Sequence, residues 1–185
     1  MSEGKITALL TQLSAAKDEV RSKAFLSLKE ISAQSPEVYR HWDFFRKMLQ
    51  SRSTNQRVIG LMLMSENARW DTEGRLKQDY RQMLSLCEDE KLTTVRQTIQ
   101  QIPLWAANLP EKLPEIIGYL MALDLSSYKD SQVNQIRQDR LQALIALNEV
   151  SPSAELDQVI QNELKANPQL KKALGPPVRK KQIKN

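Results

Sequence analysis

The feature that most constrains the fold is a helical pattern that recurs four times along the chain. In each copy an arginine stands three residues before a small or apolar residue, as in the stretch 53–71, STNQRVIGLMLMSENARWD. The arginines are Arg21, Arg57, Arg96 and Arg140, with spacings of 36, 39 and 44 residues. Repeats built from two helices have spacings in this range. The pattern therefore predicts helical pairs that stack on one another.

Apolar residues recur at helical spacing along most of the chain, and no useful length alternates with the period of two that marks a strand. We expect helices at 5–15, 18–31, 36–49, 53–71, 72–87, 92–108, from about 114 to 123, 131–150 and 154–165. Ser35 and Pro36 should open the third of these, since proline suits the first position of a helix. Pro103 should kink or break the helix over 92–108 between Gln100 and Pro103.

Each helical pair has an apolar face that it cannot bury alone. Stacking of the pairs hides these faces, so we predict an all-α fold, a short right-handed superhelix of about four helix pairs. The helix 154–165 would cover the open end as a C-terminal cap. We expect one domain over 1–166, since 185 residues suffice for a single core.

The positive charge of the chain is concentrated at its C-terminal end. The sequence has 27 Lys and Arg against 22 Asp and Glu, yet no acid follows Glu163 while seven cations do. The body is therefore close to neutral. We expect 167–185 to be a basic, proline-containing flexible tail, which either solubilises the chain or docks on an acidic partner or a phosphate backbone.

Few residues in the sequence are suited to chemistry. Cys87 is the single cysteine and His41 the single histidine, so neither a thiolate metal cluster nor a Cys-His nucleophile pair is expected. Cys87 lies on an apolar stripe and is predicted to be a buried structural thiol. We predict no enzyme activity, no cofactor and no metal. The absence of a signal segment or an apolar span predicts a cytoplasmic location.

The pattern from Val20-Arg21 to Ala24, repeated more loosely at the later arginines, resembles HEAT repeats of the armadillo-type α-solenoids. The segments 56–71, 89–97 and 124–131 together resemble a family of small bacterial HEAT-like proteins often labelled SufBD proteins. This resemblance implies an α-solenoid fold and a bacterial cytosolic setting, and it implies no known activity. Gly60 and Ile99 depart from the usual alanine, so the second and third repeats are expected to be irregular.

Polar residues near the ends of the repeats are the candidate binding residues. They are Arg57, Asn67, Trp70, Asp71, Lys91, Thr94, Arg96, Gln97, Tyr128 and Asp130. Stacking would bring them to one edge of the concave surface, where multidentate donors and a tryptophan anchor suit a peptide or protein loop. The alternative is structural: Asp71 and Asp130 cap helices, Trp70 fills a gap between repeats, and the recurring arginine clamps neighbouring repeats.

We therefore predict a non-catalytic scaffold that binds an unidentified protein or peptide, with no membrane association. The alternative is a nucleic-acid binding module that resembles the HEAT-like DNA alkylation repair glycosylases, assisted by the basic tail. In that case Arg57, Arg96, Arg137 and Arg140 should converge on one positive groove. A scaffold should instead show mixed charge around an exposed Trp70 or Trp105. The near-neutral body favours the scaffold, because duplex binding depends on many phosphate contacts.

Overall fold

The structure is a computed structural model that describes residues 3–173, and these residues form helices and turns without a strand. The prediction of an all-α fold is confirmed. The α-helices are α1 (Glu3–Gln12), α2 (Asp18–Gln34), α3 (Trp42–Met48), α4 (Thr54–Asn67), α5 (Arg75–Ser85), α6 (Leu92–Ala106), α7 (Leu113–Ala122), α8 (Asp130–Val150), α9 (Ala154–Ala166) and α10 (Leu170–Ala173). Short 3-10 turns are η1 (Tyr39–His41), η2 (Ala68–Trp70), η3 (Leu86–Glu88) and η4 (Pro110–Lys112).

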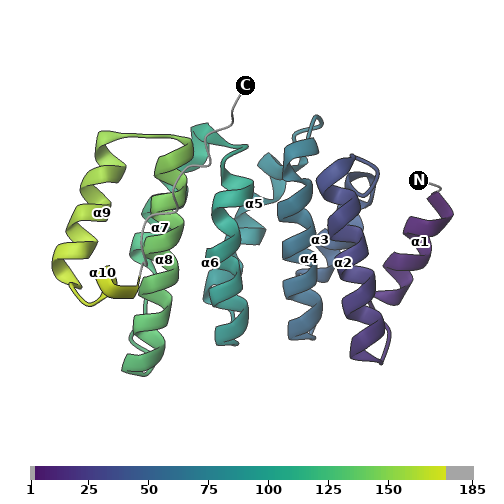
Figure 1. Cartoon of the computed structure of the whole chain (residues 1–185), viewed down its shortest axis with the longest axis horizontal. Coiled ribbons are helices and arrows are strands. Elements are labelled where there is room, and N and C mark those ends of the chain that lie inside the picture. The colour runs from purple at the N-terminus through teal and green to yellow at the C-terminus, as the bar shows by residue number, and fades with distance from the viewer. Residues whose placement is uncertain (1–2, 174–185) are drawn as a thin grey trace.

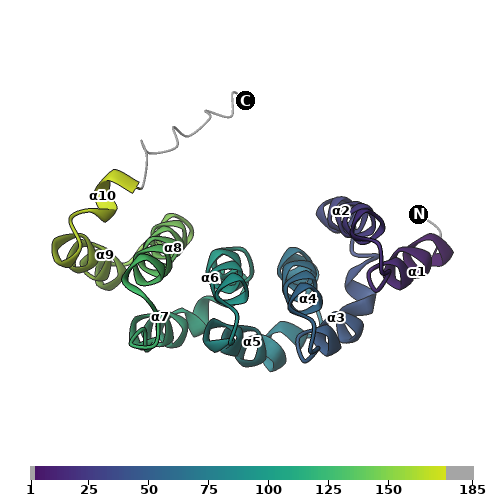
Figure 2. The ribbon, with the colours of Figure 1, turned by 90° about the horizontal axis from the view of Figure 1, so that it is seen from below.

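The helices form two layers that follow an arc (Figures 1 and 2). Helices α2, α4, α6 and α8 line the inner side of the arc, while α3, α5 and α7 lie on its outer side. The inner helices pack side by side, α2 on α4, α4 on α6 and α6 on α8, and α9 packs on α8 at the C-terminal end. Inner helices run in the same direction, because contacts join the ends of α2 and α4 and the beginnings of α4 and α6.

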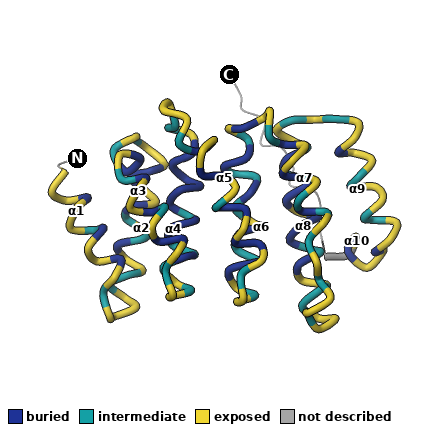
Figure 3. Tube along the Cα trace, turned by 180° about the vertical axis from the view of Figure 1, so that it is seen from behind, coloured by how far each residue is buried: buried dark blue, intermediate teal, exposed yellow. Residues whose placement is uncertain are grey.

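The core lies between the two layers and between neighbouring inner helices. Buried positions alternate with exposed ones at helical spacing along each helix, as the tube coloured by burial shows (Figure 3). Trp42 of α3 and Trp105 of α6 are both fully buried and are the two largest side chains of this core. Because the apolar stripes continue from one helix to the next, a single core connects the whole stack.

Gly60 sets the close contact between α3 and α4. A Cβ atom at this position would lie 2.7 Å from Cβ of Met48 and 2.8 Å from the backbone oxygen of Phe45. Such distances are shorter than non-bonded carbon contacts allow, so a larger residue would push the two helices apart. The glycine that departs from the alanine expected of this repeat thus has a packing reason.

Pro36 does not open a helix, contrary to the prediction. Ser35 instead ends α2 in an extended conformation, with φ −155° and ψ 158°, and its amide donates to the carbonyl of Ile31. A following proline disfavours the helical region for the residue before it, which explains this conformation. The chain then passes through a turn and η1, and α3 begins only at Trp42.

Of the kink or break predicted at Pro103, the break does not occur, since α6 runs without interruption from Leu92 to Ala106. Ile99, Ile102 and Trp105 around the proline are all fully buried. The proline removes one backbone donor, and the burial of these three large side chains offsets that loss. The expected beginning of the next outer helix at Asp71 is also too early: α5 begins at Arg75, after Gly74 with a φ of 73°.

The packed body extends past residue 166, where the flexible tail was expected to begin. Asn167 and Leu170 are 8% and 3% exposed, and α10 contacts α8. Arg137 on α8 holds this segment by donating from Nη1 to Oδ1 of Asn167 at 3.1 Å. The remainder of the expected tail, 174–185, lies outside the described residues.

Candidate functional site

The recurring arginine of α4 joins two successive helical pairs. Nε of Arg57 donates to Oδ2 of Asp89 at 2.6 Å, and Nη2 donates to Oδ1 at 2.9 Å. Nη1 also donates to the carbonyl oxygens of Ser51 and Arg52, in the loop before α4. The two charged side chains are only 9% and 6% exposed. This geometry is that of a buried bidentate pair, and it leaves Arg57 little surface for a ligand.

Two of the other recurring arginines make the same kind of contact to the next pair. Arg96 on α6 donates from Nε and Nη2 to the two oxygens of Asp139 on α8, at 2.5 and 3.3 Å. Arg140 on α8 donates from Nη2 to Glu163 of α9 at 2.7 Å. Arg21 differs, since it binds backbone carbonyls of its own loop and Asp18. Three of the four arginines thus connect neighbouring pairs, as a clamp would.

Asn67 and Trp70, at the end of α4, bind to the end of α2. Nδ2 of Asn67 donates to Oγ of Ser32 at 2.9 Å, and Nε1 of Trp70 donates to the Ser32 carbonyl at 2.6 Å. Asn67 is fully buried and Trp70 packs against the core. Their donors are therefore used to hold α4 on α2.

Asp71 organises the chain between α4 and α5. Its carboxylate accepts from the Tyr39 hydroxyl at 2.6 Å and from the backbone amides of Arg75 and Leu76 at 3.1 and 2.8 Å. Burial acts to raise the pKa of Asp71, but these hydrogen bonds outweigh it and leave the pKa below its usual value. Asp71 thereby satisfies free amides at the beginning of α5, which is the capping role of the structural alternative.

The other five candidate residues lie around the beginnings of α6 and α8. Lys91 and Asp130 are exposed, and Gln97 and Tyr128 are half-buried. Thr94 is fully buried, and its hydroxyl finds no partner among the described residues.

The structure does not bring all the candidates to one edge. Arg57, at the beginning of α4, binds Asp89 in the turn before α6. It therefore lies beside the candidates at the beginnings of α6 and α8. Asn67, Trp70 and Asp71 stand at the opposite end of α4, which has 14 residues and is about 20 Å long. The candidates therefore belong to two opposite edges of the stack.

A groove between α6 and α8 was not predicted from the sequence. Its N-terminal half, about 380 Å³, is lined by Leu92, Thr93, Arg96, Gln97, Gln100 and Gln135. Its C-terminal half, about 500 Å³, begins at Gln100 and is lined among others by Pro103, Leu104, Gln142, Ala146 and Val150. We call the two together the α6/α8 groove. The available signal was the repetition of glutamines at Gln97 and Gln100 and at Gln135 and Gln142, on exposed or half-exposed helix positions.

A second groove lies between α2 and α4, and both polar and apolar residues line it. Phe25, Asn55, Val58, Ile59 and Met62 line it, and its volume is about 370 Å³. Thr93 belongs to this groove and to the α6/α8 groove. The two grooves on the inner side of the arc thus both border Thr93, at the beginning of α6.

Two of the three charged residues in the α6/α8 groove, Arg96 and Asp139, neutralise each other, and the third is Glu149. Arg96 pairs with Asp139, whose side chain is 4% exposed, and Nε2 of Gln100 donates to the same carboxylate at 2.8 Å. Nη1 of Arg96 donates to Oε1 of Gln135 at 3.1 Å. This network fixes the side chains at the bottom of the groove and leaves neutral amides as its main polar groups.

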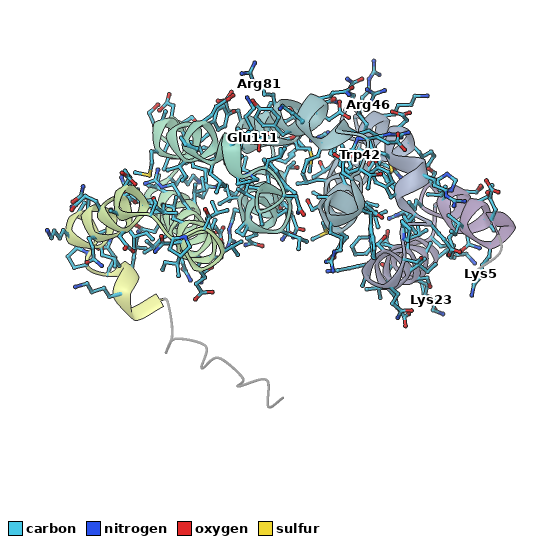
Figure 4. All side chains as sticks on the ribbon, turned by 90° about the horizontal axis from the view of Figure 1, so that it is seen from above. Lys5, Lys23, Trp42, Arg46, Arg81 and Glu111 are labelled. Atoms are coloured by element: carbon cyan, nitrogen blue, oxygen red, sulfur yellow. The ribbon has the colours of Figure 1, made fainter. Side chains whose placement is uncertain are left out.

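The outer side of the arc carries charges of both signs. Arg46 and Arg81 project from its edge, whereas Trp42 points into the interior (Figure 4). Arg81 pairs with Glu115, and Lys77 pairs with Glu111. Neighbouring opposite charges of this kind produce no extended field of one sign.

These features define the class of the molecule: an all-helical, two-layered stack with two open grooves on its inner side. No family model matches the chain, and a search of curated proteins gives no match. Among the described residues no helix is long and apolar enough to cross a membrane. The same residues contain no cluster of three or more His, Cys, Asp or Glu side chains placed to hold a metal ion.

Proposed function

We propose that the chain is a HEAT-like α-solenoid that acts as a non-catalytic scaffold and binds a protein or peptide on its inner side. The observation that carries this proposal is the presence of two open grooves on the inner side, the α2/α4 groove and the α6/α8 groove, which both border Thr93. Concave surfaces of stacked helical pairs are the usual binding surfaces of repeat proteins. Exposed and half-buried apolar side chains in both grooves offer contact area for a protein ligand.

The bound partner would occupy grooves rather than the repeat edges. Of the ten residues predicted from the sequence, Arg57, Asn67 and Trp70 already use side-chain donors within the protein, and Asp71 uses its carboxylate there. Arg96 and Gln97 border the α6/α8 groove and remain candidates for contact. We add Gln100, Gln135 and Gln142 to the site for the same reason.

The contacts of the arginines favour a protein over a nucleic acid. A phosphate backbone needs several accessible cations. Arg57, Arg96 and Arg140 each bind a carboxylate, and Arg137 donates to Asn167. The tryptophans favour neither hypothesis, because Trp105 is fully buried and Trp70, which a scaffold was also expected to expose, is only half-exposed.

Photo-cross-linking from defined positions tests the proposal. A photoreactive amino acid replaces Gln142 or Asn55 on the inner side, and Gln78, an exposed residue of the outer helix α5, serves as the matched control. After irradiation of intact source cells, we expect a discrete protein attached at Gln142 or Asn55, and none at Gln78. The purified partner should then bind the wild-type chain and bind an Ala146→Trp variant more weakly.

Cross-links from the three positions to the same proteins would contradict an inner binding surface. Nuclease-sensitive cross-links to nucleic acid alone would replace the scaffold by the nucleic-acid alternative.

A further inference from the structure

We propose that the α6/α8 groove binds an extended polypeptide segment through its main chain. This inference rests on the proposed function and narrows the partner from any protein surface to a strand-like segment. The groove follows α6 from Thr93 to Leu104, a rise of about 17 Å. An extended chain advances about 3.3 Å per residue, so the groove accommodates about five residues.

The open polar groups of the groove match a peptide group. Oε1 of Gln135 accepts from Arg96, which leaves its Nε2 donor free, and Nε2 of Gln97 donates to Gln100, which leaves its Oε1 acceptor free. Gln142 makes no hydrogen bond to another described residue, so its donors and acceptor are all available. Each residue of an extended main chain likewise offers one N–H donor and one carbonyl acceptor.

The charges in the groove favour a neutral main chain over a ligand that carries phosphate. The guanidinium of Arg96 is already neutralised by Asp139, and the carboxylate of Glu149 borders the C-terminal half of the groove without an ion pair to a described residue. A phosphate would therefore meet an unpaired negative charge and no free cation in the groove. A neutral main chain incurs no such repulsion, and a lysine or arginine beside it would pair with Glu149.

The C-terminal half of the groove adds a preference for an apolar side chain. Pro103, Leu104 and Ala146 line it, and Val150 at its end is 60% exposed. An apolar side chain from the bound segment would remove this surface from water. The segment should thus combine main-chain hydrogen bonds near Gln97 and Gln135 with one apolar residue near Val150.

Selection from a displayed library of random 12-residue peptides supplies the probe, with the full chain as bait. Affinity of a selected peptide is then measured for Gln135→Met and Gln142→Met, which keep side-chain length and remove the amide. Each should weaken binding roughly 3- to 10-fold, as the loss of one or two hydrogen bonds does. Gln78→Met on α5 should leave affinity unchanged. Thermal unfolding of each variant checks that it remains folded.

Main-chain recognition is tested by esters in the bound peptide. Replacement of a single peptide bond by an ester removes one N–H donor and keeps the side chain. We expect a loss of affinity at some positions of a five-residue stretch and none outside it.

Different results would reject main-chain binding alone and reject the scaffold as well. If no ester changes affinity, or if binding is lost in Asn55→Leu but not in the glutamine variants, the inference fails and an inner-side scaffold remains. If a single-stranded 12-nucleotide DNA binds more tightly than every selected peptide, both fail.

Discussion

Arg57 and Asp89 form a buried two-bond ion pair across 32 residues of sequence, with Nε to Oδ2 at 2.6 Å and Nη2 to Oδ1 at 2.9 Å. The pair joins the beginning of α4 to the turn before α6. The backbone amide of Lys91 also donates to Oδ1 of Asp89 at 2.8 Å. One carboxylate thus fixes the entry to α6 and its position against α4.

Removal of one member of this pair should destabilise the stack. We expect Arg57→Met to lower the free energy of unfolding by about 3 kcal/mol, because Asp89 is left buried without its partner. Chemical denaturation monitored by circular dichroism measures the change. The double variant Arg57→Met, Asp89→Leu should recover part of the loss. As a control, Arg81→Met removes an exposed pair with Glu115 and should leave the midpoint nearly unchanged. Equal effects of Arg57→Met and Arg81→Met would contradict the clamp.

Gly60 should not tolerate a methyl group. In Gly60→Ala the new Cβ would collide with Met48 and the Phe45 carbonyl, so we expect a loss of about 1–3 kcal/mol in unfolding free energy. Gly118→Ala in α7 is the matched comparison, since a Cβ there meets nothing within 4 Å. That variant should gain roughly 0.5–1 kcal/mol from helix propensity. A neutral or stabilising Gly60→Ala would show that α3 and α4 are not in close contact.

How far the sequence predicts this fold depends on whether the signal is local. Apolar residues at helical spacing predicted a helix over 131–150, and the structure has α8 over Asp130–Val150. The prediction is confirmed because this element depends on a local periodic pattern. Pro103 does not break α6, because the effect of a proline on a helix depends on neighbours that a local pattern does not contain. The core packing around Ile102 and Trp105 keeps α6 continuous.

The candidate site was less predictable for a related reason. A polar side chain near a repeat end is equally suited to a ligand or to a neighbouring helix, and the choice depends on distant partners. Ser32 takes the donors of Asn67 and Trp70, and neither lies near it in the sequence. The glutamines of the groove carried a weaker signal, because single exposed glutamines are common on helices.

The pH dependence of stability should include a contribution from Asp71. Its pKa in the folded chain lies below the usual value of 3.8 for an aspartate. The stabilisation is therefore fully present above that value, and it is lost as the pH falls through the lower folded pKa. Denaturation curves between pH 7 and pH 2 should show a weaker acid dependence in Asp71→Asn than in the wild type.

Tyr39→Phe provides a second check on Asp71. It removes the hydroxyl that donates to the carboxylate, so an NMR titration should show the pKa of Asp71 moving up toward its usual value. An unchanged pKa would mean that the hydrogen bond contributes nothing.

Cys87 should be inert while the chain is folded. The side chain is 3% exposed, and burial, assisted by the neighbouring Glu88, raises the pKa of the thiol well above its usual range. Alkylation by iodoacetamide at pH 8 should be slow in the native chain and fast in denaturant. Rapid native labelling would contradict the packing around η3.

The most direct test of the inner-side scaffold is an NMR titration of the ¹⁵N-labelled full chain with a selected peptide. We predict that the side-chain amide signals of Gln97, Gln135 and Gln142 shift together with backbone signals of α6 and α8, while Gln78 stays unchanged. Shifts confined to the outer helices α3, α5 and α7, with the glutamines of the groove unaffected, would contradict it.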